Sequence, residues 1–87
     1  MKVLFQKSPY EVVFTDHALL QMGLRDLDQA IILDVIATGK VKAKEAESKF
    51  WAYKEIAGRK DNLISVSISI ESPHLIVITT MINWRPL

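Results

Sequence analysis

The residues best suited to chemistry in this sequence lie in the stretch FTDHALLQMGLRD, residues 14–26. His17 and Gln21 are four residues apart and Arg25 follows after four more, so the three share one face if the stretch is helical. His17 is the strongest candidate for proton transfer, because imidazole has the side-chain pKa nearest neutrality. A histidine near a helix start can equally cap the helix or pack, and the sequence leaves both roles open.

A second candidate group lies on the stretch KFWAYKEI, residues 49–56, which is rich in strand-forming residues. Strand alternation places Lys49, Trp51 and Tyr53 on one face and Lys54 on the other. Aromatic side chains beside lysines can stack nucleic-acid bases and hold phosphates. The alternative is that Trp51 and Tyr53 belong to the core.

The end of the chain carries further polar side chains on Thr79, Thr80, Asn83 and Arg85. They could bind phosphate, or they could form an ordinary strand exit. Two histidines and no cysteine argue against a zinc site, and the sequence has no glycine-rich phosphate loop and no nucleophile motif. We therefore expect neither a metal nor a cofactor.

The first elements that would position these residues are a short strand and two helices. We expect the strand at residues 10–14 and a helix that Thr15 caps and that ends near Gly23. The second helix should begin at a capping box, residues 26–29, whose acid at Asp26 is followed by a glutamine three residues on. Gly39 should end it in the left-handed conformation.

The rest of the chain has the alternation of strands. Residues 49–56, 62–71 and 75–83 read as strands, and residues 40–45 fit either a further strand or an irregular basic arm. Alternation in the second strand leaves the serines on an open face: Ser65, Ser67 and Ser69. The expected fold class is α+β, with a short N-terminal strand, two helices, and a three- to four-stranded antiparallel sheet that the helices cover on one face.

Length and composition set the remaining limits. The 87 residues suffice for a single domain spanning 1–87, and the absence of cysteine and of a long apolar run suits a soluble protein of the cytoplasm with no membrane contact. The net charge is +1, but residues 40–60 hold seven basic and three acidic side chains. Such a cluster can mark a surface that meets a polyanion, although a solvated hairpin would look the same.

The pattern T-x-H-A-x-x-x-M-x-x-R, which runs from Thr15 to Arg25, resembles a bacterial family of domains of unknown function. The members of that family typically have T-x-H-A-x-x-R-M-x-x-R-G-I, a helix that ends in a turn glycine, a basic hairpin, and a last strand that ends before Arg-Pro. The family is regarded as a relative of the RelE, BrnT and MqsR-type ribonuclease toxins and of the barnase-like toxin domains. The similarity covers residues 12–86.

The resemblance implies metal-independent RNA cleavage, in which the 2′-hydroxyl of the substrate attacks the adjacent phosphate. His17 would supply the acid or base, and Arg25 with Arg85 or Lys54 would stabilise the charge that develops on the phosphorane. The implied substrate contacts come from Gln21, Lys49, Trp51, Tyr53 and Thr80. The implied partners are RNA and a cognate antitoxin or immunity protein.

Two positions depart from the family pattern, because Gln21 stands where the family usually has arginine and Asp26 where it has glycine. Loss of a guanidinium from a phosphate site could lower activity by orders of magnitude. A catalytically degenerate RNA- or protein-binding module therefore remains an alternative. A third is a homodimer that buries the last strand and Trp84.

Overall fold

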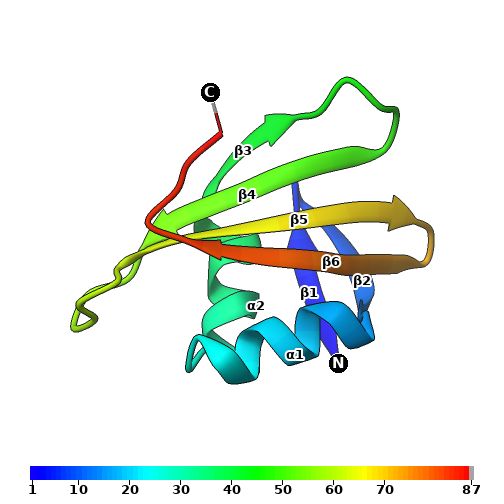
Figure 1. Ribbon diagram of the computed structural model, residues 1–87. Helices are drawn as coiled ribbons and strands as arrows, with labels where there is room; N and C mark the ends of the chain where they lie inside the picture. The colour runs from blue at the N-terminus through cyan, green and yellow to red at the C-terminus, as the bar shows by residue number, and fades with distance from the viewer. Residues whose placement is uncertain (87) are drawn as a thin grey trace.

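The computed structural model describes residues 1–86, which form six strands and two helices (Figure 1). In chain order these are β1 (Lys2–Phe5), β2 (Ser8–Phe14), α1 (Asp16–Leu24), α2 (Gln29–Thr38), β3 (Lys40–Ala43), β4 (Lys49–Glu55), β5 (Leu63–Glu71) and β6 (His74–Ile82). All six strands belong to one sheet, in the order β1-β2-β6-β5-β4-β3. The last strand, β6, therefore lies between β2 from the N-terminal part of the chain and β5 from the C-terminal part.

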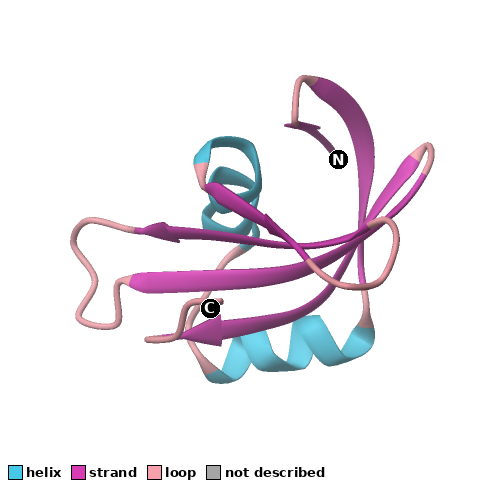
Figure 2. Ribbon diagram, turned by 90° about the horizontal axis from the view of Figure 1, so that it is seen from above, coloured by secondary structure: helices cyan, strands magenta, loops and turns pink. Residues whose placement is uncertain are grey.

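The sheet is mixed and strongly curled. β2 pairs with β6 in parallel, and every other neighbouring pair is antiparallel. Figure 2 shows that the end of the sheet formed by β1 and β2 bends round to the side on which α2 lies. The curl makes the sheet a half-barrel around α2, while α1 lies alongside β6 (Figure 1).

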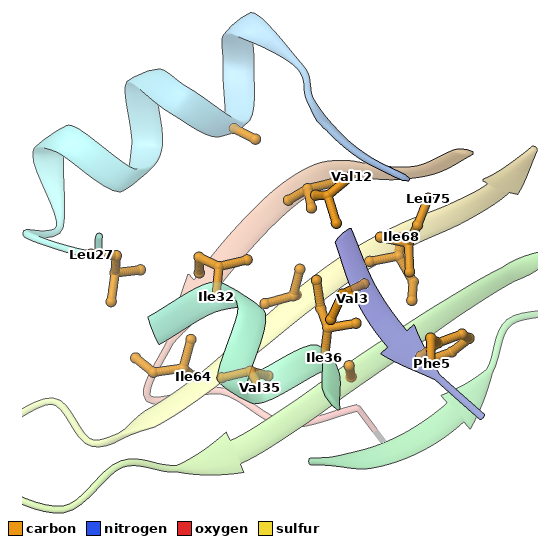
Figure 3. Packing of buried hydrophobic residues seen from close by; sticks show 14 of the residues in the cluster. Val3, Phe5, Val12, Leu27, Ile32, Val35, Ile36, Ile64, Ile68 and Leu75 are labelled. Atoms are coloured by element: carbon orange, nitrogen blue, oxygen red, sulfur yellow. The ribbon is translucent and has the colours of Figure 1, made fainter. Parts of the chain in front are cut away.

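The core fills the space between α2 and the concave side of the sheet (Figure 3). From α2 it takes Ile32, Val35 and Ile36, whose spacing of three and four residues forms one apolar stripe. They pack against alternate residues of the strands, namely Val3 and Phe5 of β1 and Ile64, Val66 and Ile68 of β5. Full burial of each such side chain is worth about 1.5–3 kcal/mol, so this one helix organises much of the apolar stabilisation.

The expected fold class is wrong in its sheet and in the placement of its helices. The sheet has six mixed strands instead of three or four antiparallel ones, and α1 and α2 do not share one face. The missing strand β1 forms a hairpin with β2 through Gln6 and Lys7, both at positive φ (51° and 70°). Glycine or asparagine usually marks such a turn, so these residues gave no signal. The parallel pairing of β2 with β6 joins segments about sixty residues apart, which no local pattern encodes.

Both helices are confirmed, with one shifted start. Thr15 caps α1 through its hydroxyl, which accepts from the amide of Ala18 at 3.1 Å. α2 is capped by Asp28, which accepts from the amide of Ile31 at 2.9 Å, and not by Asp26. Asp26 lies in the connection between the helices at a φ of 53°. The short segment 40–45 forms the strand β3 over its first four residues.

Gly39 ends α2 for a reason different from the expected one. Its φ is −76°, which any residue can adopt, so left-handed geometry is not the requirement. A Cβ at this position would lie 2.7 Å from the carbonyl oxygen of Tyr53 and closer still to that of Val35. Glycine is needed here because the end of α2 directly abuts the backbone of β4.

We predict that Gly39→Ala lowers the free energy of unfolding by about 1–3 kcal/mol, because two backbone groups must move to admit the methyl group. The matched control is Gly23→Ala in α1, where a Cβ would meet nothing within 4 Å. That change should stabilise by roughly 0.5–1 kcal/mol through helix propensity. Urea unfolding of both variants checks the prediction, and a loss of stability in both or in neither would contradict it.

Candidate functional site

The face of the sheet turned away from α2, called here the outer face, collects basic and aromatic side chains. β3 contributes Lys40 and Lys42, which pair across the strands with Tyr53 and Trp51 of β4. Lys49 lies on the same face of β4 because it is two residues from Trp51. The predicted grouping of Lys49, Trp51 and Tyr53 on one face is confirmed.

The serines of β5 lie on this same face, but they are not open to solvent as expected. Ser65, Ser67 and Ser69 are only 0%, 1% and 6% exposed. After β6 the chain reverses at Asn83, whose φ is 56°, and runs back across the outer face over β5 and β4 (Figure 1). The hydroxyl of Ser65 donates to the carbonyl oxygen of Trp84 in this returning segment. The C-terminal segment thus contacts the hydroxyl of Ser65, and Lys44 donates to that of Ser67, although alternation alone assigns both hydroxyls to water.

Trp84 packs against Trp51 in a tilted arrangement, with the ring centroids 4.6 Å apart and the planes at 58°. The ammonium group of Lys44 lies 4.3 Å from the centroid of the Trp51 ring and also donates to the hydroxyl of Ser67. Partial burial lowers the pKa of Lys44, and the charge of Lys49 lowers it further. Trp51, Trp84 and Lys44 line an open cleft of about 490 Å³, here called the tryptophan cleft, together with Lys42, Ala43, Glu45 and Pro86.

Lys44 and Trp84 were not among the predicted site residues. Lys40, Lys42 and Lys44 alternate in the sequence, but the sequence does not show that Lys44, in the loop after β3, contacts Ser67 of β5. No sequence signal tells that Trp84 folds back onto Trp51.

A second cleft, of about 350 Å³, lies between the end of α2 and the outer face. We call it the cationic cleft, since Lys40, Lys54 and Arg85 line it with Tyr53 and Glu55. The structure therefore brings Lys54 and Arg85, two of the predicted phosphate-stabilising residues, to one place.

The cations of the cationic cleft differ in how firmly they are held. Lys54 donates to a carboxylate oxygen of Asp34 at 2.8 Å and to the hydroxyl of Thr38 at 2.7 Å. The hydrogen bond from Lys54 lowers the pKa of Asp34. Among residues 1–86, Arg85 has a single ion pair, a loose one with Glu55 at 3.7 Å.

The other predicted residues lie at the edge of β6. β2 stops pairing with β6 after Phe14 and Val77, and α1 continues where the strand leaves. The side chain of Gln21 accepts from the amide of Thr80 at 3.0 Å and from the hydroxyl of Thr79. Arg25 donates to the carbonyl oxygen of Thr80. Polar side chains of α1 thus occupy the hydrogen-bonding groups that a neighbouring strand would otherwise satisfy.

Neighbouring contacts complete this edge. The hydroxyl of Thr15 donates to the carbonyl oxygen of Ile78 at 3.0 Å. The guanidinium of Arg59 donates to the carbonyl oxygens of Arg25 and Asp26 and so holds the end of α1. Thr80 itself is fully buried on the core side, and its hydroxyl has no hydrogen-bond partner among the described residues. The side chains of Gln21 and Arg25 thus stabilise the β6 edge through the backbone of Thr80, whose own side chain is buried.

His17 stays apart from the outer-face group. Its side chain is exposed, and it makes no hydrogen bond or ion pair with another described residue. α1 lies alongside β6, and β5 lies between β6 and β4. β4 is therefore two strand spacings, about 10 Å, from β6 across the sheet. The predicted site residues thus fall into two groups, one at the α1–β6 edge and one on the outer face and in the cationic cleft beside it, where Lys54 reaches in from the α2 side.

The edge contacts make a testable prediction for Gln21. Gln21→Leu leaves the amide of Thr80 without an acceptor in a partly buried place and should cost about 1–3 kcal/mol of unfolding free energy. Gln21→Glu keeps an accepting oxygen and should cost clearly less. Chemical denaturation of the two variants measures the difference, and equal losses would show that the bond to Thr80 does not stabilise the edge.

Comparison with known proteins places the chain in one family. Residues 14–82 match the model of the family described as "Domain of unknown function (DUF4258)", so the chain belongs to this family. The match begins at the end of β2 and ends with β6, so it includes the candidate residues of α1, β4 and β6 but not Trp84 and Arg85, which follow β6. No curated protein and no solved structure matches the chain.

Two further findings concern membrane-spanning helices and metal sites in the described part of the chain. Neither α1 nor α2 has the length and the apolar composition that a bilayer-spanning helix needs. Among residues 1–86, no three histidine or acidic side chains gather in a way that could hold a metal ion.

Proposed function

We propose that this domain binds single-stranded RNA on its outer face. The observation that carries the proposal is the cluster of Trp51, Trp84 and Lys44 at the tryptophan cleft. A tilted pair of indoles with an ammonium group beside it suits the stacking of a base and the attraction of the phosphate next to it. Trp84 is 37% exposed, so one ring of the pair is within reach of a ligand.

The charges around the cleft support the same function. Lys40, Lys42 and Lys49 surround the aromatic pair on the outer face. Glu45 and Glu47 lie in the loop between β3 and β4 and offset part of this charge. With a net charge of only +1, binding should be modest and should weaken strongly as salt is raised.

The prediction for this function concerns stacking. Trp84→Leu keeps an apolar side chain but removes the aromatic ring that is within reach of a ligand, and it should weaken RNA binding about 5- to 150-fold, the equivalent of one stacked base. The measurement is fluorescence anisotropy of a labelled single-stranded oligouridylate at low salt. Trp84→Phe, which can still stack, is the matched control and should stay near the wild type. Equal affinity of Trp84→Leu and the wild type would refute a stacking role.

A second function, ribonuclease activity, follows from the resemblance to the RelE, BrnT and MqsR-type toxins. The observation in its favour is that His17 is exposed and makes no hydrogen bond or ion pair within residues 1–86, so its imidazole is accessible to a substrate. Transfer of the 2′-hydroxyl proton to a base would accompany attack on the phosphate, and the leaving 5′-oxygen would take up a proton. A cognate antitoxin or immunity protein would then be the natural partner.

The engagement of Gln21 and Arg25 with the β6 edge makes RNA binding the better-supported function. Both side chains already hold backbone groups of Thr80, so neither is free to meet a phosphate without breaking those bonds. The degenerate binding module is therefore our leading proposal, and cleavage is the second.

Cleavage is tested by incubating the purified protein with labelled RNA in EDTA and analysing the products for 2′,3′-cyclic phosphate ends. If the second function holds, the wild type cleaves and His17→Ala loses at least about 100-fold in rate, as expected for loss of a general acid or base. His74→Ala, which changes the other exposed histidine, is the control and should cleave normally. Equal cleavage by His17→Ala would remove His17 from the mechanism.

A further inference from the structure

The tryptophan cleft and the cationic cleft flank the same C-terminal segment. Trp84 and Pro86 line the first, and Arg85 between them lines the second. On β4, Trp51 belongs to the first and Tyr53 to the second, so the two clefts are about 7 Å apart along the strand. A ligand with an aromatic part and an adjacent anionic part could therefore occupy both.

The cationic cleft has the charge for the anionic part. Three cationic side chains and one carboxylate line it. Lys54 is anchored by Asp34 and Thr38, and although Asp34 offsets its charge, the third N–H of its ammonium group can donate to an anion from a fixed place. The hydroxyl of Tyr53 makes no hydrogen bond with another described residue and can donate to an anion.

Arg85 is the side chain able to change partner. Its contact with Glu55 is long, at 3.7 Å, and the two side chains are 58% and 66% exposed. Exposed ion pairs of this kind contribute little to stability. A phosphate offers the guanidinium two acceptor oxygens in matching geometry, which a loose carboxylate contact does not. Glu55 therefore acts as a competitor for Arg85.

We propose that the cationic cleft is a phosphate subsite, which receives a phosphodiester group of the RNA strand whose base stacks in the tryptophan cleft. Arg85 leaves Glu55 to bind the phosphate, Lys40 faces it from β3, and Lys54 donates its third N–H to it. This inference rests on the proposed RNA binding and adds to it the place of one phosphate.

The test uses the two members of the ion pair, which should respond in opposite directions. Arg85→Gln should weaken binding of the oligouridylate severalfold, and Glu55→Gln should strengthen it severalfold because the competing carboxylate is gone. Arg85→Gln should also reduce the slope of log affinity against log salt by about 0.7, the value for one phosphate contact on a single strand. Glu71→Gln at the far end of β5 makes the same charge change as Glu55→Gln and should leave affinity nearly unchanged.

The outcomes separate the phosphate subsite from RNA binding itself. If the wild type binds RNA but Arg85→Gln leaves the salt slope unchanged, the subsite is wrong while RNA binding stands. If Arg85→Gln and Glu55→Gln change the affinity for RNA in the same direction, the ion pair is only a structural contact and the phosphate subsite is likewise wrong. If the wild type binds no RNA at low salt, both proposals fall together. Circular dichroism of each variant confirms that the fold is kept.

Discussion

The parallel pairing of β2 with β6 is the constraint on which the rest of the structure depends. It joins the N-terminal hairpin to the last strand and extends the antiparallel strands into a six-stranded sheet that can curl around α2. Because β2 ends beside Val77, the following part of β6 has no strand partner on that side. α1 follows directly and supplies Gln21 and Arg25 to the exposed backbone groups, so an edge that would otherwise be open is closed by side chains.

This arrangement explains why α1 contributes mainly polar contacts to the fold, whereas α2 contributes mainly apolar ones. α2 sits inside the curl, and its stripe of Ile32, Val35 and Ile36 is buried from all sides. α1 lies at a strand edge, where it must bury Ala18 and Met22 and also hydrogen-bond to a backbone. The sequence of α1 suggested a catalytic site on its polar face. In the structure this face also has a structural role.

The outer face owes its character to the reversal of the chain at Asn83. The returning segment lays Trp84 on Trp51, brings Arg85 next to Glu55 and accepts a hydrogen bond from Ser65 of β5. It therefore turns a flat polar strand surface into two clefts, one aromatic and one cationic, on either side of itself. The binding surface that we propose is thus made jointly by the sheet and by the residues that follow its last strand.

The sequence by itself determined what depends on neighbouring residues. The Thr15 cap of α1, the periodicity of α2, the alternation of β4 and β5, and the common face of Lys49, Trp51 and Tyr53 follow from spacing alone, because each rests on local geometry. Only the tertiary structure decided the hairpin through Gln6 and Lys7, the β2–β6 pairing, the burial of the serines, and the separation of His17 from the outer face. These depend on contacts between distant segments, whose free energy comes from closing the sheet around one core and leaves no periodic trace in the chain.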